Sequence, residues 1–249
     1  MPPAMFRVWR GERGEGGFKD YKTDVGPGMV VLDAIHQIQA ESAPDLAARW
    51  NCKAGKCGSC SAEINGTPKL MCMTRLSDLN LDMPVIVEPL KAFPVVRDLV
   101  CDVSWNYKVK QRIKKFQPRK PDFPDGTWKM EQADIERVQE FRKCIECYLC
   151  QDVCHVLRDH HKHGSFSGPR FFIYTAALEM HPLDTADRTR DLKEQDGIGY
   201  CNITKCCTKV CPEEITITDN GIIPLKERVV DRFYDPLARA FRVLAGERG

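Results

Sequence analysis

Cysteine is the residue type most able to do chemistry in this chain of 249 residues. It occurs thirteen times, and twelve of these thiols fall into three groups along the chain. The groups are Cys52, Cys57, Cys60 and Cys72; Cys144, Cys147, Cys150 and Cys154; and Cys201, Cys206, Cys207 and Cys211, with Cys101 alone after the first. The count is odd, and the N-terminal residues lack the apolar core of a secretory signal, so disulfides are not the expected use. Clustered thiols of this kind indicate metal ligands kept reduced in a cytosol.

The first group has the spacing C-x4-C-x2-C, followed after eleven residues by a further cysteine. This is the spacing of plant-type 2Fe-2S proteins. A short loop must wrap such a cluster and aim backbone amides at its sulfurs, and two glycines in the loop allow the sharp bends. The predicted ligands are Cys52, Cys57, Cys60 and Cys72. A four-cysteine zinc site is the alternative, although zinc knuckles seldom use a C-x4-C-x2-C wrap.

The second group reads C-x2-C-x2-C-x3-C, the bacterial ferredoxin run in which three thiols hold one cubane and the fourth reaches a neighbouring cluster. The same template, laid backwards on the third group from Cys211, puts Cys207 and Cys201 at ligand positions and Thr204 at the middle one. A hydroxyl is a poor substitute for thiolate on iron, so this cluster is expected to lack one corner and to be 3Fe-4S. The predicted ligands are Cys144, Cys147, Cys150 and Cys211 for a 4Fe-4S cluster, and Cys154, Cys201 and Cys207 for the 3Fe-4S cluster.

Two cysteines remain outside these ligand sets. Cys101 is expected to pack as a small apolar residue. Cys206 adjoins a predicted ligand and could supply the missing corner, but neighbouring residues rarely point at the same cluster.

The pattern of apolar and turn residues predicts two domains and a linker. Strand-like segments at 6–10, 18–25, 61–66 and 85–90, with a helix at 30–38, indicate a small mixed α/β domain over residues 1–107. The basic, proline-rich stretch 108–125 is expected to be a linker, which could also dock an acidic patch of a partner. Helical patterns at 134–144, 170–180 and 225–244, the last broken at Pro236, indicate an all-α domain over residues 126–249.

Charge and hydropathy exclude several classes of function. The formal net charge is +2, so no strong overall field favours nucleic acid, and none is expected as a partner. No apolar run approaches the roughly 18 to 20 residues of a membrane-spanning helix. Any membrane location is therefore expected to come through a partner.

The motifs WNCKAGKCGSC, the later Cys72, CIECYLCQDVC and CNITKCCTKVCP, in this order, resemble the iron-sulfur subunit of succinate dehydrogenase or fumarate reductase. The resemblance covers nearly the whole chain. It implies an α+β fold, with an N-terminal β-grasp plant-type 2Fe-2S ferredoxin domain followed by an all-α, bacterial ferredoxin-like domain that holds two clusters.

The family also implies a respiratory membrane complex. In it a flavoprotein subunit with covalent FAD oxidises succinate or reduces fumarate, this subunit carries electrons one at a time, and a membrane anchor presents quinone beside the 3Fe-4S cluster. The carbon chemistry takes place on the flavoprotein, so no catalytic residue is expected here. The implied location is the cytoplasmic face of a bacterial inner membrane, because the N-terminus does not look like a transit peptide.

The chain departs from the family pattern at the expected quinone site. In many members the cysteine matching Cys154 is followed by proline, whereas this chain has His155. Ubiquinone-using relatives place a tryptophan where this chain has Asp159. These departures favour a menaquinone-type acceptor. His155 either supplies protons to the quinone, since imidazole titrates near neutral pH, or simply belongs to a solvated loop.

Two other functions fit parts of the sequence. One is the iron-sulfur subunit of another flavoprotein dehydrogenase, for glycerol phosphate or glycolate, but such subunits usually lack the 2Fe-2S half. The other is a zinc-stabilised interaction protein that transfers no electrons, which metal analysis distinguishes.

Overall fold

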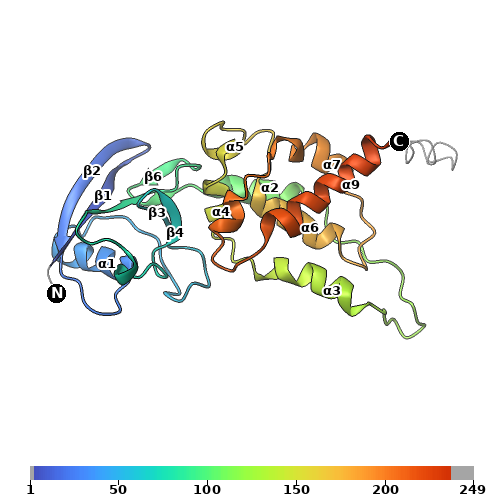
Figure 1. The fold of residues 1–249 in the computed structure, drawn as a ribbon, viewed down its shortest axis with the longest axis horizontal. Helices are drawn as coiled ribbons and strands as arrows, with labels where there is room; N and C mark the ends of the chain where they lie inside the picture. Colours follow the sequence, from blue (N-terminus) through green and yellow to red (C-terminus); the bar gives the residue numbers. More distant parts are fainter. Residues whose placement is uncertain (1–2, 237–249) are drawn as a thin grey trace.

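The strands lie within residues 4–101, together with one α-helix and a 3-10 turn, and the described residues after 101 form helices and loops (Figure 1). The structure is a computed structural model, and it describes residues 3–236. The strands are β1 (Ala4–Glu12), β2 (Glu15–Thr23), β3 (Ser61–Ile64), β4 (Thr67–Leu70), β5 (Val85–Glu88), β6 (Val95–Arg97) and β7 (Val100–Cys101). The helices of the first half and of the connection are α1 (Val31–Glu41), η1 (Leu76–Asp78) and α2 (Ser104–Arg112). Those that follow are α3 (Gln132–Gln139), η2 (Glu140–Lys143), α4 (Leu149–Asp152), α5 (His155–Arg158), α6 (Pro169–Glu179), α7 (Thr189–Glu194), η3 (Ile198–Tyr200), α8 (Cys206–Lys209), η4 (Ile217–Ile222) and α9 (Ile223–Phe233).

The strands form one mixed sheet around β1. The order is β4-β3-β5-β1-β6-β7, with β2 also paired to β1; β1 runs antiparallel to β2 and parallel to β5. Alternate β1 residues such as Phe6 and Val8 are fully buried, as a half-buried strand requires. The last two residues of the predicted segment 61–66, Asn65 and Gly66, form the turn that joins β3 to β4, and both have positive φ, as a two-residue hairpin needs.

Helix α1 covers the sheet beside the first cysteine loop (Figure 1). Its buried residues recur at helical spacing, including Leu32, Ile35 and Ile38. At its start the Asp33 carboxylate accepts a hydrogen bond from the Val30 amide, which satisfies one of the free N–H groups of the first turn. The helix therefore anchors the sheet from which the cysteine loop extends.

The second half confirms the all-α expectation, with differences of detail. The predicted helix 134–144 ends at Gln139 and continues as the 3-10 turn η2, so that the chain bends before Cys144. The segment 170–180 forms α6, and the predicted C-terminal helix begins at Ile223 as α9. The part of that prediction beyond residue 236 lies outside the described residues.

The two halves are joined by buried polar contacts as well as by a continuous apolar core. Glu63 of β3, with no exposed side-chain surface, pairs with Arg158 of α5 at 2.7 Å. The Ala92 amide donates to the Asp152 carboxylate at 2.9 Å. Trp105 donates to the His163 carbonyl, and its ring packs edge-on against the His163 imidazole. His163 is thus a packing residue between the halves.

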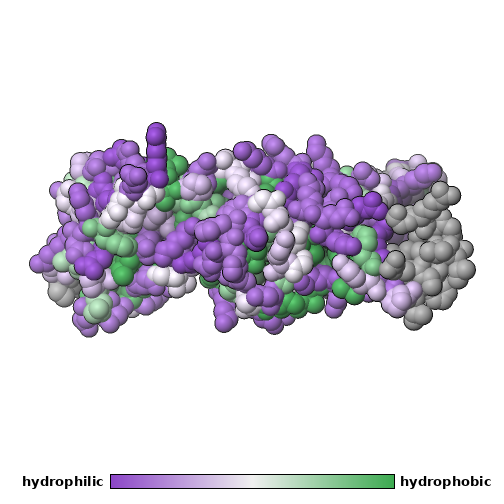
Figure 2. Space-filling model, turned by 90° about the horizontal axis from the view of Figure 1, so that it is seen from above, coloured by the Kyte–Doolittle hydropathy of each residue, from purple (hydrophilic) through white to green (hydrophobic). Residues whose placement is uncertain are grey.

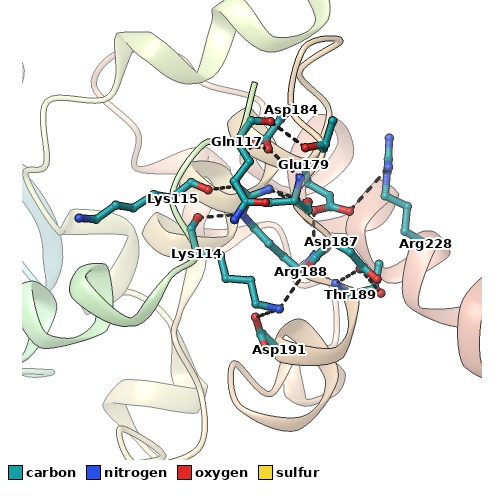
Figure 3. Close-up of polar contacts among 12 residues, drawn as sticks. Lys114, Lys115, Gln117, Glu179, Asp184, Asp187, Arg188, Thr189, Asp191 and Arg228 are labelled. Carbon is teal, nitrogen blue, oxygen red and sulfur yellow. Dashed lines mark hydrogen bonds and ion pairs between the residues drawn. The ribbon is translucent and has the colours of Figure 1, made fainter. Parts of the chain in front are cut away.

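The predicted linker 108–125 begins inside a helix, because α2 continues to Arg112. Val109 and Ile113 are buried against Phe171 of α6, which explains why this basic stretch is helical at its start. Directly after this helix, the carbonyls of Lys114 and Lys115 accept hydrogen bonds from the buried Arg188 side chain, which holds the segment in place (Figure 3). The boundaries of the predicted domains stay a prediction.

Most of the face shown in Figure 2 is hydrophilic, with apolar side chains in small interspersed patches. Within residues 3–236 no helix combines the length and the apolar character needed to cross a bilayer.

Candidate iron-sulfur sites

The first cysteine loop, between α1 and β3, has no helix or strand. Its backbone turns toward sulfur: the amides of Ala54 and Lys56 lie 3.4 and 3.3 Å from the Cys52 thiol. Burial works against ionisation of Cys57, but hydrogen bonds from the amides of Cys52 and Ser59 outweigh it and lower the pKa of Cys57 to about 6. Amides aimed at sulfur are what stabilise an anionic cluster.

The last two thiols of this group lie on the interior side of the loop. Cys60 and Cys72 are 3% and 6% exposed, whereas Cys52 is exposed. The Cys72 amide lies 3.5 Å from the Cys60 sulfur, so the distant fourth cysteine of the spacing is brought to the loop. Burial, and then the neighbouring Cys72 thiol, raise the pKa of Cys60 to about 12. The four predicted ligands are therefore gathered at one place.

The second and third cysteine groups have the same local backbone. In the loop that begins at Cys144, the residues two and four positions on, Glu146 and Tyr148, have positive φ, and α4 follows directly. In the loop that begins at Cys201, the residues at the same offsets have positive φ, and α8 follows directly. This repeat puts Thr204 at the place of Cys147, and Cys206 at the place of the core residue Leu149.

The fourth thiols of the two loops cross over. Cys150 is almost fully buried, and burial together with the thiols of Cys147, Cys144, Cys207 and Cys211 raises its pKa. A cavity beside it is lined by Cys144, Cys147, Cys150 and Cys211, together with Arg170 and apolar residues that include Ile173, Ile215 and Ile217. Cys211 thus lies with the thiols of the second loop, and its role as a ligand of their cluster stays a prediction.

The remaining thiols lie near one another: Cys154 is close to Cys206 and Cys207, and Cys207 is close to Cys201. Cys154 and Cys207 are 6% and 5% exposed, and Cys201 is partly exposed. Burial first, and then the nearby thiols of Cys206 and Cys207, raise the pKa of Cys154 to about 12. The Cys206 sulfur lies 3.2 Å from the Thr204 hydroxyl. Cys101 is buried, its thiol donates to the Leu90 carbonyl at 3.5 Å, and it lines the cleft between the first and second groups.

The donor chemistry fits iron-sulfur clusters. Cysteine thiolates hold such clusters, two on each iron of a 2Fe-2S cluster and one on each iron of a cubane, so the feature required is several neighbouring thiols. All three groups bring thiols together; amides approach sulfur in the first group, and apolar side chains line the cavity of the second. In residues 3–236 no three His, Cys, Asp or Glu side chains are arranged around a single metal ion.

The first and second cysteine loops touch each other. Gly58 has φ +67°, and a Cβ atom there would lie 2.6 Å from the Cys147 Cα. The Ser61 hydroxyl lies 2.9 Å from the carbonyls of both Gly58 and Cys147. A cleft of about 420 Å³ opens at this junction, lined in part by Arg49 and Tyr107. Sequence reasoning did not identify this contact, because nothing in the spacing of one loop specifies its neighbour.

Two family models match the chain: a 2Fe-2S iron-sulfur cluster binding domain over residues 5–108, and a 4Fe-4S dicluster domain over residues 140–215. The fumarate reductase iron-sulfur subunit of Mycobacterium tuberculosis is 33% identical over 202 residues, which cover 80% of each chain. The chain belongs to the iron-sulfur subunits of succinate dehydrogenase and fumarate reductase. It is thus a subunit of an oxidoreductase complex, and the predicted fold class is confirmed.

Other relatives of this iron-sulfur subunit are similar to it over most of its length. A chain of the Mycobacterium smegmatis Sdh1 complex in its apo form has a TM-score of 0.91 and 59% identity, over 95% of this chain and 99% of that one. An uncharacterised iron-sulfur protein of Methanococcus maripaludis is 31% identical over 224 residues. That alignment covers 88% of this chain but only 43% of the relative, so the chain spans less than half of that protein. Membership of this family replaces the two alternatives from the sequence, the iron-sulfur subunit of another flavoprotein dehydrogenase and a zinc-stabilised interaction protein.

The predicted quinone-site residue His155 begins α5, directly after Cys154, and is partly exposed. Its ring centroid is 6.0 Å from that of His160. Asp159, the residue predicted to replace the quinone-site tryptophan, is exposed. Arg170, which lines the cavity of the second group, was not identified from the sequence, because it lies far along the chain from any cysteine motif.

Proposed function

We propose that this subunit carries electrons one at a time between the FAD of a flavoprotein subunit and a quinone held by a membrane anchor. When bound, 2Fe-2S, 4Fe-4S and 3Fe-4S clusters would supply the one-electron carriers. The observation that carries the proposal is the succession of three thiol groups, in which the first loop touches the second at Gly58 and Cys147 and the second shares its thiols with the third. Neighbouring carriers favour transfer, because electron tunnelling weakens steeply with distance.

The proposed ligands follow the three groups in space. The 2Fe-2S cluster takes Cys52, Cys57, Cys60 and Cys72; the 4Fe-4S cluster takes Cys144, Cys147, Cys150 and Cys211; and the 3Fe-4S cluster takes Cys154, Cys201 and Cys207. The repeated backbone of the second and third loops supports the last set, since Thr204 stands where the second loop has Cys147.

Exposed apolar side chains at both ends of this succession support docking of partners there. Trp50 and Met73, 47% and 58% exposed, flank the first loop, where Cys52 is also exposed. Tyr200 and Ile203, 51% and 38% exposed, flank Cys201 in the third group. We assign the first end to the flavoprotein and the second to the anchor and its quinone. The subunit would then lie at the cytoplasmic face of the membrane, held by the anchor.

The acceptor in this proposal is a menaquinone-type quinone, with His155 supplying protons. His155 adjoins a proposed 3Fe-4S ligand and is partly exposed, so it could reach both the quinone and water. An exposed carboxylate at Asp159 in place of an indole would remove a hydrogen-bond donor from a ubiquinone pocket.

Anaerobic purification of the whole complex tests the cluster content. We expect about nine iron atoms for this subunit, with electron paramagnetic resonance (EPR) signals from a reduced 2Fe-2S and an oxidised 3Fe-4S centre. Zinc without acid-labile sulfide would overturn the proposal, and two 4Fe-4S clusters with no 3Fe-4S signal would overturn the role given to Thr204.

Turnover with soluble quinone analogues tests the acceptor. We expect the complex to turn over with a menaquinone analogue, and the His155→Ala variant to lose that activity while its EPR signals persist. Faster turnover with a ubiquinone analogue would contradict the menaquinone assignment, and full activity of His155→Ala would contradict the proton role.

A further inference from the structure

A buried arginine faces the cavity of the second cysteine group. Arg170 is the second residue of α6, and its side chain is only 6% exposed. It lines the cavity together with Cys144, Cys147 and Cys150. Cavity walls beside iron-sulfur clusters are usually apolar, and the other side chains here are mostly of that kind. A guanidinium at this place requires an explanation, because burying a cation without partners is costly.

The position of Arg170 is fixed by the same loop that carries the cysteines. Its backbone amide lies 3.3 Å from the Gln151 side-chain oxygen, and the Gln151 amide donates to the Ser167 carbonyl at 3.0 Å. Gln151 follows Cys150 directly and is fully buried. The start of α6 is thus tied to the cysteine loop, so Arg170 has little freedom to turn away from the cavity.

The hydrogen bonds of Arg170 are incomplete. One terminal nitrogen lies 2.8 Å from the Glu146 carboxylate, but Nε is buried and has no partner among residues 3–236. Burial opposes its charge, whereas the nearby Cys144 thiolate and Glu146 carboxylate raise the pKa of Arg170 above its ordinary value. The Glu146 carboxylate does not depend on Arg170 for charge compensation, since Lys110 lies 2.5 Å from it. The free Nε–H therefore remains to be explained.

We infer that Arg170 donates a hydrogen bond from Nε to a sulfur of the 4Fe-4S cluster and raises the reduction potential of that cluster. The inference rests on the proposed cluster at Cys144, Cys147, Cys150 and Cys211. A reduced cluster carries one more negative charge than an oxidised one, so a donor and a positive charge at its surface stabilise the reduced form. Lys110 and Arg170 carry two positive charges against the one negative charge of Glu146, and Glu213, which also lines the cavity, is paired with Lys56, so these side chains leave one net positive charge.

Redox titration of the complex, followed by EPR of the 4Fe-4S cluster, tests the inference. In Arg170→Met we expect the ratio of oxidised to reduced cluster at a fixed ambient potential to rise about tenfold, which is a potential lower by about 59 mV for one electron. Arg170→Lys keeps the charge but loses the fixed Nε–H, and is expected to shift the ratio by less. Arg112→Met is the matched control, because Arg112 also has a buried, unpartnered Nε but does not line the cavity.

Several results would overturn the inference. An unchanged reduction potential of the 4Fe-4S cluster in Arg170→Met would overturn it. An equal shift of that potential in Arg112→Met, or an equal shift of the potentials of the other two clusters, would also overturn it, because either would indicate a general structural effect. Pulsed EPR on the unmutated complex with arginine labelled by ¹⁵N at Nε needs no variant. We expect a nitrogen coupled to the reduced 4Fe-4S cluster, and its absence would refute the hydrogen bond. Lack of any 4Fe-4S signal in the unmutated complex would refute the proposed cluster content, which is a different failure.

Discussion

Replacing Gly58 with alanine should disturb the junction between the first two cysteine loops. The new Cβ atom would lie 2.6 Å from the Cys147 Cα and 2.9 Å from the Cys147 Cβ and N. Carbon atoms in contact are about 3.5 to 4.0 Å apart, so one loop must retreat by about 1 Å. The left-handed φ of +67° adds about 1 to 2 kcal/mol of backbone strain, and overpacking adds about 1 to 3 kcal/mol. The total cost is therefore about 2 to 5 kcal/mol.

Gly66→Ala is the matched control for this prediction. Gly66 has φ +75° but no atom within 4 Å of its added Cβ, so only the backbone strain applies. The urea concentration at which the visible absorbance of the clusters disappears measures stability. The magnetic interaction between the reduced 2Fe-2S and 4Fe-4S centres measures their separation. Gly58→Ala should lower the urea concentration of bleaching and weaken the magnetic interaction, in each case well below the values of Gly66→Ala. Equal values of these two quantities in the two variants would refute the reasoning.

Three further predictions concern other parts of the second half. Arg188→Met should lower the free energy of unfolding by about 3 to 5 kcal/mol, because Arg188 and Asp184 form an ion pair in which both side chains are 1% exposed. A loss below about 1 kcal/mol, which is the value of a surface ion pair, would contradict this prediction. Cys206→Ser should leave the iron content and the 3Fe-4S signal unchanged, and loss of iron would show that Cys206 is a ligand. Burial opposes ionisation of Glu140, but its hydrogen bonds, the largest of them from Asn220, keep the pKa of Glu140 below the ordinary value of a glutamate. The stability that these bonds provide is therefore present at pH values above the ordinary pKa, and it is lost as pH falls through the lowered pKa of the folded protein. Glu140→Gln should flatten this acid limb in stability measured against pH, and an unchanged slope would contradict the assignment.

Elements with a clear apolar pattern could be predicted from the sequence, including the four-residue strands β3 and β5, whereas elements without one could not. β1 and α1 repeat their apolar residues at the periods of a strand and a helix, so both were found, although their ends differ by a few residues. β4 was missed because it contains Pro68 and an exposed lysine, and β7 has only two residues. Such strands exist because a neighbour pairs with them, and pairing does not show in local pattern.

The spacing of cysteines determined which thiols could gather locally, since a few residues of backbone hold them near one another in any fold. The ferredoxin spacing also predicted that Cys211 joins the cluster of Cys144; the two thiols line one cavity, and their shared cluster stays a prediction. Only the tertiary structure decided that Gly58 touches Cys147 and that Arg170 lines the cavity of the second group. These contacts join segments distant in sequence, and they arise from the packing of one half against the other and of α6 against the cysteine loop. Packing of this kind depends on the shapes of many residues at once, so no short motif carries it.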